Sequence, residues 1–508
     1  MADECECAKP GHGNAMARPN LLFLFTDEQR FDTLAGYGNT AIQMPNLNRL
    51  AETSVVIERA YVTQPVCTPS RASILTGLYP HASRCTQNNA SLPADVACLP
   101  ELMSSRDYVT GYHGKWHLGD EIFAQHGFDD FVSIEDIYTQ YYSPGRDRAA
   151  RSSYHAFLLQ QGLRPTNGDR FTRGEAARLP EQYGKPAFLA REASRFIRQN
   201  RDRPFVLYVN FLEPHMPFFG PRDDQYDPAD VRLPPNFDCP PTEQQPLKTR
   251  LFERGYFQRG HSGLPLQTEA HWRRMTANYW GLCSLVDTHA GTILDTLREC
   301  DLWDNTIIVF TSDHGDMMGS HRLLAKCVMF EEAARVPLLL HLPGQTKARR
   351  IRAPVSQIDL VPTLLDLMAE SVPGDLQGKS LGRLLGGGSA VGQEDVFIEW
   401  NGPNNGFGAD RLDQTDVPPW MAELASKDQI ERAITDPVRT VITPDGWKFN
   451  CSPLGEHELY NLSTDPLEKH NLASDRQYQS AMRDLFERIR RWQDNTLDSV
   501  TLPSIPAR

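Results

Sequence analysis

Three short apolar runs predict strands that are buried on both faces. They cover residues 20–26, 204–210 and 306–311, and each is a continuous rather than an alternating run of apolar side chains. Such runs are typical of parallel strands with helices on both sides. Polar residues follow each run: Asp27-Glu28, Glu213-Pro214-His215 and Asp313-His314. Because ligands of parallel sheets bind beyond the carboxyl ends of the strands, we expect a functional site where these residues meet.

Helical patterns alternate with these strands. Residues 70–77, 187–200, 278–300 and 357–368 show the spacing of a helix, and the first of these segments follows Pro69. Strand–helix alternation indicates a mostly parallel sheet that is covered by helices on both faces. The predicted fold class is therefore α/β.

The chain changes character at Gly386-Gly387-Gly388-Ser389, a run that is typical of a linker. Beyond it, residues 394–400, 439–443 and 447–450 predict short strands, and residues 477–494 predict an amphipathic helix. We therefore expect a flexible tail at 1–18, a large domain at 19–388, and a smaller C-terminal α+β domain with a short antiparallel sheet at 389–508.

One segment of the large domain breaks the alternation. Residues 217–270 are rich in proline and polar residues and show no clear periodicity. A long irregular insert of this kind is either a lid that faces the substrate or a surface excursion, and the sequence favours neither. We expect it to lack regular structure.

Composition narrows the class of protein. The 508 residues are 40% apolar and 23% charged, which is typical of a soluble globular protein. The net charge of −13 argues against nucleic-acid binding, although cations gathered in a cleft can still bind an anion. No apolar run approaches the roughly 18 residues that span a bilayer, and residues 1–20 lack the pattern of an export signal. The 10 cysteines show no pairing rhythm, which indicates a reducing compartment. From these features together we expect a cytoplasmic protein that does not bind a membrane.

The acidic residues at two of the strand ends are candidate metal ligands. Asp27 and Glu28 follow the first apolar run, and Asp313 and His314 follow the third. Clustered carboxylates suit a hard divalent cation such as calcium or magnesium. Acidic residues at strand ends also cap the helices that follow, so the pattern alone leaves both interpretations open.

The run Cys67-Thr68-Pro69-Ser70-Arg71 is the most specific motif in the chain. A cysteine followed two residues later by proline and four later by arginine resembles the signature that formylglycine-generating enzymes read in type I sulfatases. Further segments resemble that family in the same order, namely residues 26–30, Gly114-Lys115-Trp116-His117-Leu118-Gly119, residues 312–315 and residues 458–472. Five motifs in the right order make chance similarity very improbable, whereas one motif alone would be only a hypothesis.

The resemblance implies a fold, a nucleophile and a metal. The fold is an alkaline-phosphatase-like α/β/α sandwich, in which residues 19–388 form the catalytic domain. Cys67 is oxidised to formylglycine, and the hydrate of this aldehyde is the nucleophile. One divalent metal, with Ca²⁺ as the first choice and Mg²⁺ or Mn²⁺ as alternatives, is bound by Asp27, Glu28, the modified Cys67, Asp313 and His314.

The same resemblance assigns roles to other side chains. Lys115 and Lys326 contact the sulfate group, and Arg71 steadies the hydrate and the sulfuryl oxygens. His117 hydrogen-bonds the formylglycine hydroxyl and then receives its proton, and His215 protonates the departing alcohol. Without the resemblance, Lys326 would be a surface lysine and each lone histidine a structural one. We also place His81, Asn88, Asn89 and His321 near the pocket, with no role assigned.

The predicted function is hydrolysis of a small-molecule sulfate ester to an alcohol and inorganic sulfate, after maturation by a formylglycine-generating enzyme. Assembly into a homo-oligomer is left open. The nearest alternative is a phosphonate monoester or phosphodiester hydrolase of the same superfamily, and a phosphatase with two metals is more distant. A catalytically silent binding protein on this fold would have lost some of the site residues, and none is missing. The alcohol could be an aryl group, a sugar or a small alkyl group such as choline.

Overall fold

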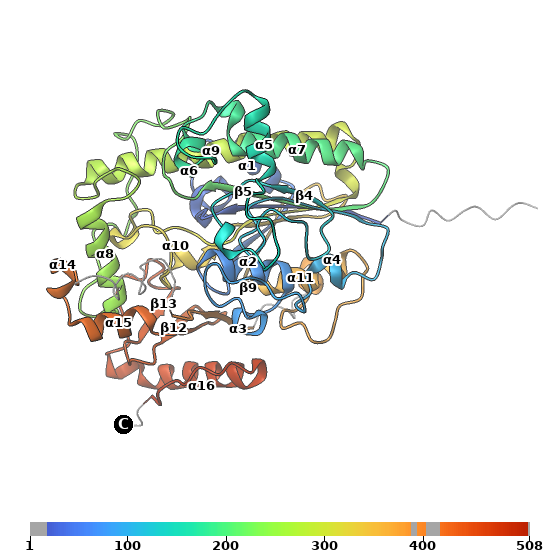
Figure 1. The fold of residues 1–508 in the computed structure, drawn as a ribbon. Helices are drawn as coiled ribbons and strands as arrows, with labels where there is room; N and C mark the ends of the chain where they lie inside the picture. Colours follow the sequence, from blue (N-terminus) through green and yellow to red (C-terminus); the bar gives the residue numbers. More distant parts are fainter. Residues whose placement is uncertain (1–17, 388–393, 403–416, 506–508) are drawn as a thin grey trace, which may run out of the picture.

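The centre of the molecule is one large β-sheet. The computed structural model describes residues 18–387, 394–402 and 417–505, and within these residues nine strands form this sheet (Figure 1). In spatial order the strands are β4 (Asp130–Ser133), β3 (Val109–Gly114), β5 (Phe205–Pro214), β1 (Asn20–Asp27), β6 (Thr306–Ser312), β8 (Leu338–His341), β2 (Val55–Tyr61) and β7 (Arg335–Val336), and β9 (Arg349–Ser356) pairs with β2. The strands from β4 to β6 are all parallel, whereas β8 and β7 run antiparallel to their neighbours. The prediction of a mostly parallel sheet is confirmed.

Strand β1 is buried along its whole length. Leu22 and Leu24 belong to the hydrophobic core on one face of the sheet, and Leu21, Phe23 and Phe25 belong to the core on the other face. Successive side chains of a strand point to opposite faces, so a strand between two helical layers must be apolar at every position. This packing explains the continuous apolar run at 20–26.

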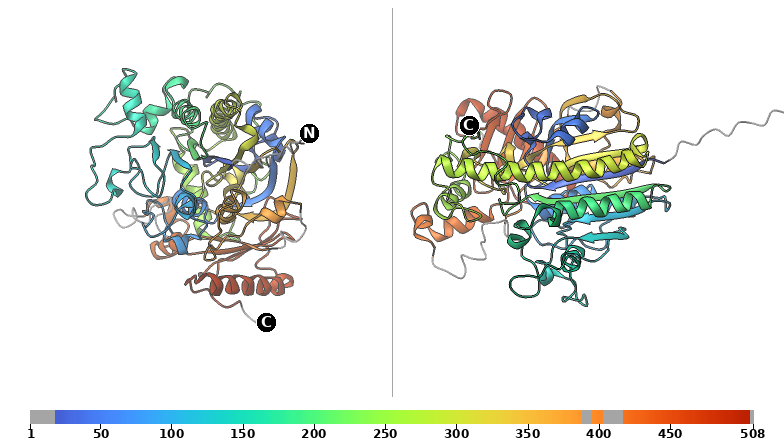
Figure 2. Two further views of the ribbon diagram at one scale, coloured as in Figure 1. Left: turned by 90° about the vertical axis from the view of Figure 1, so that its right-hand side faces the viewer. Right: turned by 90° about the horizontal axis from the view of Figure 1, so that it is seen from above.

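Helices cover both faces of the sheet. One layer contains α1 (Pro45–Ala51), α7 (Lys185–Gln199) and α9 (Glu269–Glu299), and the opposite layer contains α2 (Cys67–Thr76), α4 (Leu99–Leu102) and α11 (Leu360–Leu367). Figure 2 shows α7 and α9 side by side along the sheet. The predicted helices at 70–77, 187–200, 278–300 and 357–368 all exist, with shifted ends. Helix α2 starts earlier than predicted because Pro69 lies in its first turn, where no backbone N–H donor is needed.

Apart from the C-terminal helix Gln479–Thr496, the other α-helices of the described residues are shorter and lie in the connections. They are α3 (Pro80–Ser83), α5 (Ser153–Gln160), α6 (Arg173–Ala177), α8 (Leu247–Arg259), α10 (Glu331–Ala334), α12 (Gly382–Leu385), α14 (Pro419–Ala422) and α15 (Lys427–Thr435). Among the helices of the described residues, none combines the length and the apolar character needed to cross a bilayer.

Helix α8 corrects the prediction that residues 217–270 lack regular structure. Its Leu247 and Leu251 pack against Met421 of α14 and Ile430 of α15. These partners are distant in the sequence, and charged residues separate the apolar positions of α8 without leaving a clear helical stripe. Tertiary packing therefore stabilises a helix that the local pattern does not indicate.

A second, smaller sheet lies in the C-terminal part of the chain. Strands β10 (Val396–Glu399), β11 (Arg439–Ile442), β12 (Trp447–Cys451) and β13 (Glu458–Asn461) pair antiparallel in this order. Helix α16 (Gln479–Thr496) packs against this sheet and lies on the side away from the large sheet (Figure 1). The predicted α+β region with a short antiparallel sheet is confirmed. Residues 1–17 of the predicted tail and the linker residues Gly388-Ser389 lie outside the described residues.

A buried polar network joins the two sheets. Lys448 of β12 lies 3.2 Å from a carboxylate oxygen of Glu331 in α10 and 2.8 Å from one of Glu468. The Tyr61 hydroxyl of β2 donates to the other oxygen of Glu331 at 3.0 Å. All four side chains are buried, so each charge depends on its partners for compensation.

Replacing Lys448 by methionine should weaken this junction. The substitution removes the cation that Glu331 and Glu468 share and leaves Glu331 with the more distant Arg335, at 3.9 Å. The loss of one partner from a buried ion pair costs about 3 kcal/mol or more. We expect urea unfolding, followed by tryptophan fluorescence, to show a midpoint lowered accordingly. The matched control is Lys427→Met, because Lys427 pairs with Glu431 on the exposed surface of α15, where such a pair contributes at most about 1 kcal/mol. Equal midpoints for the two variants would contradict a structural role of Lys448.

Candidate active site

The candidate site lies where three neighbouring strands end. Strand β1 lies between β5 and β6 and pairs parallel with both, so the carboxyl ends of all three strands meet at one edge of the sheet. Asp27 ends β1, His215 directly follows β5, and Asp313 directly follows β6. The order of the strands therefore explains why these residues lie close together, as the sequence predicts.

Cys67 is the first residue of α2 and faces this edge of the sheet. Its Sγ lies 3.3 Å from His314 Nε2 and 3.7 Å from Asp27 Oδ1. The N-terminus of a helix carries a partial positive charge, which stabilises a negative group placed there. Burial and the Asp27 carboxylate act to raise the pKa of the Cys67 thiol, but the charges of Lys115, Lys326 and His314 together lower it below its usual value.

Arg71 lies one helical turn after Cys67, so both side chains are on the same side of α2. Its guanidinium is fully buried, 2.7 Å from Asp27 Oδ2 and 2.9 Å from Asp313 Oδ2. It also donates to the side-chain oxygen of Asn210 at 2.7 Å. Arg71 does not line the pocket described below. Arg71 therefore holds two carboxylates in position, and its contact with the sulfate stays a prediction.

Four residues could share one metal ion. The ligand atoms of Asp27, Cys67, Asp313 and His314 all lie within 4.8 Å of one another. Burial acts to raise the pKa of Asp27, but the charges of Lys115 and Arg71 hold it well below its usual range, so this carboxylate is ionised. Buried carboxylate oxygens with a histidine nitrogen form a donor set that fits a divalent cation. The residues therefore fit the metal that the sequence predicts.

His314 carries positive charge in this arrangement. Its Nε2 lies 3.7 Å from Asp27 Oδ1 and 3.6 Å from Asp313 Oδ1. Burial acts to lower the pKa of His314, but the negative charges of Asp313 and Cys67 raise it to about 9. We call Asp27, Asp313 and His314 the acidic corner. Protonated His314 compensates the negative charges of the acidic corner, and a divalent cation bound there would compensate the same charges.

Glu28 contacts a different set of groups from Asp27. Its backbone adopts φ 72°, a left-handed conformation that turns the chain sharply after β1. One carboxylate oxygen lies 2.8 Å from Lys326 Nζ and 3.5 Å from His215 Nε2, while the other has no hydrogen-bond partner. Burial raises the pKa of Glu28 to about 8. Glu28 therefore lies beside the predicted metal position and holds Lys326 at the same time.

Gly114 and Glu121 position the Lys115–His117 turn. Gly114 has φ 132°, and a Cβ atom there would lie 2.0 Å from the Asn210 carbonyl oxygen, so only glycine fits. Lys115 Nζ lies 2.6 Å from Asp27 Oδ2. The buried Glu121 carboxylate accepts the backbone N–H groups of Trp116 at 2.9 Å and of His117 at 2.6 Å. The turn is therefore held from both sides.

Both predicted catalytic histidines are neutral. Burial, and then the charge of Lys115, lowers the pKa of His117 well below its usual value, and burial with Lys326 does the same for His215. His117 Nε2 lies 2.9 Å from the Asn89 side-chain oxygen, which leaves Nδ1 as an acceptor without a partner. His215 Nδ1 lies 2.8 Å from the Met216 carbonyl oxygen, so Nδ1 carries the proton and Nε2 is the acceptor.

A pocket of about 480 Å³ opens over these residues. Cys67, Lys115, His117, His215 and Lys326 all line it. Asn88 and Asn89 line it as well, whereas His81 bonds to Glu399 and His321 bonds to the backbone at Cys239 and Leu467. The insert at 217–270 also lines the pocket, as its interpretation as a substrate-facing segment predicts, through Phe252, Tyr256, Arg259, Gly260 and His261. The sequence does not single out the other lining residues, which are Tyr138, Arg173, Met216, Ala325 and Cys327.

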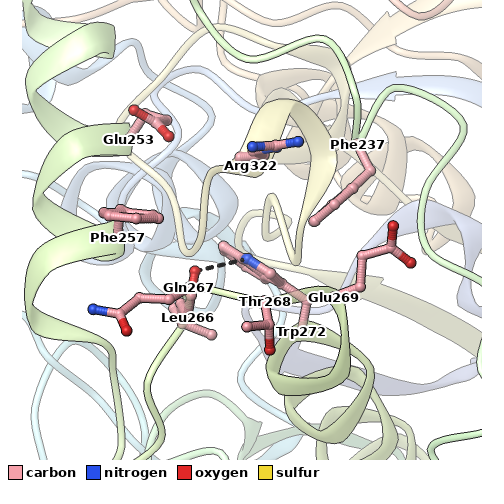
Figure 3. Close-up of a pocket in the computed structure, with 9 residues that line it drawn as sticks. All are labelled: Phe237, Glu253, Phe257, Leu266, Gln267, Thr268, Glu269, Trp272 and Arg322. Carbon is pink, nitrogen blue, oxygen red and sulfur yellow. Dashed lines mark hydrogen bonds between the residues drawn. The ribbon is translucent and has the colours of Figure 1, made fainter.

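A second, smaller cavity of about 210 Å³ lies on the neighbouring face of α8 (Figure 3). Glu253 and Phe257 of α8 line it together with Phe237, Trp272 and Arg322. The Trp272 indole N–H already donates to the Leu266 carbonyl oxygen at 3.1 Å (Figure 3). None of the predicted catalytic or metal-binding residues lines this cavity, so the larger pocket is the candidate active site.

Known proteins share the features of this chain. A family model described as Sulfatase matches residues 19–370. A multifunctional alkaline phosphatase superfamily protein of Trinickia caryophylli is 27% identical over 94% of this chain and 96% of that protein. The choline-sulfatase of Rhizobium meliloti (strain 1021) is 27% identical over 96% of this chain and 89% of that protein. The solved structure of a phosphonate monoester hydrolase from Silicibacter pomeroyi has the same fold, with a TM-score of 0.74 at 23% identity, covering 95% of this chain and 98% of that chain.

The family model extends from before the start of β1 to beyond the end of α11, so it includes Cys67, both acidic strand ends and Lys326. The similarity to whole proteins continues through the small C-terminal sheet. The chain belongs to the sulfatase family of sulfuric ester hydrolases.

Proposed function

We propose that this protein hydrolyses a sulfate monoester with a nucleophile made from Cys67. The observation that carries the proposal is the position of Cys67, which begins α2 next to the acidic corner and lines the same pocket as Lys115, Lys326, His117 and His215. A formylglycine-generating enzyme would oxidise the thiol to an aldehyde. The hydrate of that aldehyde supplies a hydroxyl that attacks sulfur, and it releases inorganic sulfate when the aldehyde forms again.

Lys115 and Lys326 bind the sulfuryl oxygens in this proposal. Each ammonium group already touches a buried carboxylate, Asp27 or Glu28, so its position is fixed before the substrate enters. Arg71 orients Asp27 and Asp313 through its two ion pairs and thereby positions the acidic corner against Cys67. These side chains are already in position, so they can stabilise the charge that develops on the transferred sulfuryl group without reorganising.

His117 and His215 accept and donate protons in this proposal. His117 Nδ1 is a buried acceptor without a partner, and this suits it to receive the proton of the nucleophile hydroxyl. His215 Nε2 is an acceptor that becomes protonated when an anionic substrate adds negative charge beside it, since a nearby negative charge raises a histidine pKa. It can then protonate the departing alkoxide.

Asp27, Asp313 and His314 would hold a divalent metal, with Glu28 and the modified residue 67 beside it. When bound, this metal supplies positive charge for a sulfate oxygen and favours the ionised nucleophile. Oxygen-rich ligation favours Ca²⁺, with Mg²⁺ or Mn²⁺ as alternatives.

Hydrolysis of a phosphonate monoester is the second candidate, because the fold is shared with the phosphonate monoester hydrolase named above. The proposal favours sulfate esters, since Lys115 and His117 stand in a motif that resembles sulfatases. A comparison of kcat/KM for 4-nitrophenyl sulfate and 4-nitrophenyl phenylphosphonate decides between the two. We expect the sulfate ester to be the better substrate, and the opposite ratio would make the second candidate the function.

Conversion of Cys67 should be visible by mass. Peptide mass spectrometry of active protein should show a loss of about 18 Da at residue 67, as expected for a thiol converted to an aldehyde nucleophile. Cys67→Ala should abolish turnover of 4-nitrophenyl sulfate and leave the circular dichroism spectrum unchanged. Cys300→Ala, a half-buried cysteine at the end of α9, is the control and should retain activity. Fully active protein with an unmodified thiol at residue 67 would refute the mechanism.

Loss of one carboxylate should release the metal. Asp313→Asn removes a buried charge from the acidic corner, so we expect its metal affinity, measured by titration, to fall about tenfold or more. Elemental analysis after dialysis should find near one metal ion per chain in the parent protein and much less in the variant. Asp304→Asn, at the exposed start of β6, should keep its metal. Two zinc ions per chain in the parent protein would instead indicate a two-metal phosphatase.

A further inference from the structure

The wall of the active-site pocket beyond the sulfate-binding groups is positively charged. Arg173 of α6 and Arg259 of α8 line this wall, in addition to Lys115 and Lys326 near Cys67. Among the described residues, no aspartate or glutamate lines the pocket. The carboxylates that pair with the lysines lie behind them, in the acidic corner. A molecule that fills the pocket therefore meets cations without exposed anions.

Arg173 keeps its positive charge although it is largely buried. Its Nε lies 2.6 Å from Glu135 Oε2, and one guanidinium nitrogen donates to the Tyr138 hydroxyl at 2.7 Å. Lys185 pairs with the other oxygen of Glu135, so two cations share one carboxylate. The nearby Glu213 offsets only part of this positive charge, because burial raises its pKa to about 7 and it is about half ionised near neutral pH. This cluster thus presents a net positive charge to the pocket.

Arg259 approaches from another wall. It lies in the last turn of α8, exposed, with its guanidinium 5.8 Å from the centre of the Trp420 ring. His261 lies two residues later in the same pocket wall. Burial lowers the pKa of His261 to about 4, and the charges of Lys326 and Arg259 act in the same direction. His261 is therefore close to both cations and is neutral, so it can hydrogen-bond to a ligand without attracting it by charge.

Aromatic side chains complete the lining. Tyr138 packs against His117, with ring centres 4.4 Å apart and ring planes tilted by 31°, and its hydroxyl accepts a hydrogen bond from Arg173. Phe252 and Tyr256 come from α8, one helical turn apart, and therefore lie on the same side of that helix. Flat apolar surfaces next to fixed cations suit a ring that carries an anionic substituent.

We propose that the natural substrate is a sulfate ester of a ring alcohol that carries a second anionic group, either a carboxylate or a further sulfate, which Arg173 and Arg259 bind. The inference rests on the proposed sulfatase function and deepens it. An oxyanion is the group that two guanidinium side chains recognise best. A cationic alcohol such as choline would be repelled by both arginines and would find no carboxylate in the described lining.

Matched substrates test the charge preference directly. The pair consists of 4-(carboxymethyl)phenyl sulfate and its methyl ester, which have the same ring and nearly the same leaving group but differ in charge. 4-(2-Sulfooxyethyl)phenyl sulfate distinguishes a second sulfate from a carboxylate, and choline sulfate is the cationic probe. All are assayed as release of the alcohol by protein with confirmed formylglycine at residue 67. We expect kcat/KM for the better of the two dianions to exceed that for the ester about tenfold, and added salt to reduce this ratio.

Arg259→Gln tests the assigned residue. Arg259 is exposed, so its replacement should not disturb folding, whereas removal of Arg173 would leave Glu135 with one partner fewer. The acid-to-ester ratio should fall about tenfold in Arg259→Gln, with most of the change in KM, because a charge-assisted hydrogen bond to the ligand is lost. The matched control is Arg254→Gln, since Arg254 lies on the same helix but pairs with Glu423 outside the pocket. Its ratio should equal that of the parent protein.

The possible failures are distinguishable. If the methyl ester is hydrolysed at least as well as both dianions, or choline sulfate is hydrolysed better than either, the inference about the alcohol is wrong and the sulfatase function stands. The same ratio in Arg259→Gln and Arg254→Gln would remove Arg259 from anion binding and overturn the assignment. If formylglycine-containing protein hydrolyses none of these sulfate esters, the proposed function itself fails, and this inference fails with it.

Discussion

The two buried ion pairs of Arg71, with Asp27 and with Asp313, hold the site together. They join α2 to the ends of two neighbouring strands, so the residue that starts α2 cannot move relative to the acidic corner. Three ionised groups without solvent contact are costly unless each is compensated, and here the guanidinium also binds Asn210 and the Lys115 carbonyl oxygen. A single side chain therefore fixes the helix, the strand ends and the lysine turn relative to one another.

Backbone conformation contributes as much to the site as side-chain charge. Glu28 adopts a left-handed conformation directly after Asp27, and His117 does so two residues after Lys115, which contacts Asp27. Such conformations are unfavourable for non-glycine residues and persist only where the surroundings enforce them. Around His117 the enforcement is visible, because Glu121 accepts two consecutive backbone N–H groups. Polar residues that are close in the sequence, such as Lys115 and His117, can thus line the same pocket.

The sequence predicts those parts of the protein that depend on local pattern or on a motif. The central strands, the main helices and the small antiparallel sheet follow from apolar runs and periodicity, and the site residues follow from strand ends and from the Cys67 and Lys115 motifs. Helix α8 could not be predicted, since its apolar residues pack against helices that are distant in the chain. The contacts of Arg71 with Asp27 and Asp313 could not be predicted either, because a sequence shows the charge of a side chain but not the direction in which it points. Arg173, Glu121 and His261 carry no signal beyond their residue type. Only the folded chain brings Arg173 and His261 to the pocket and Glu121 to the Lys115–His117 turn.

Helix α8 shows how chemistry and recognition are separated in this molecule. It supplies one wall of the active-site pocket through Phe252 and Tyr256, whereas its Leu247 and Leu251 pack on α14 and α15. Substitutions in α14 and α15, or on the side of α8 that faces them, can therefore shift this wall of the pocket while Cys67 and the strand ends stay in place.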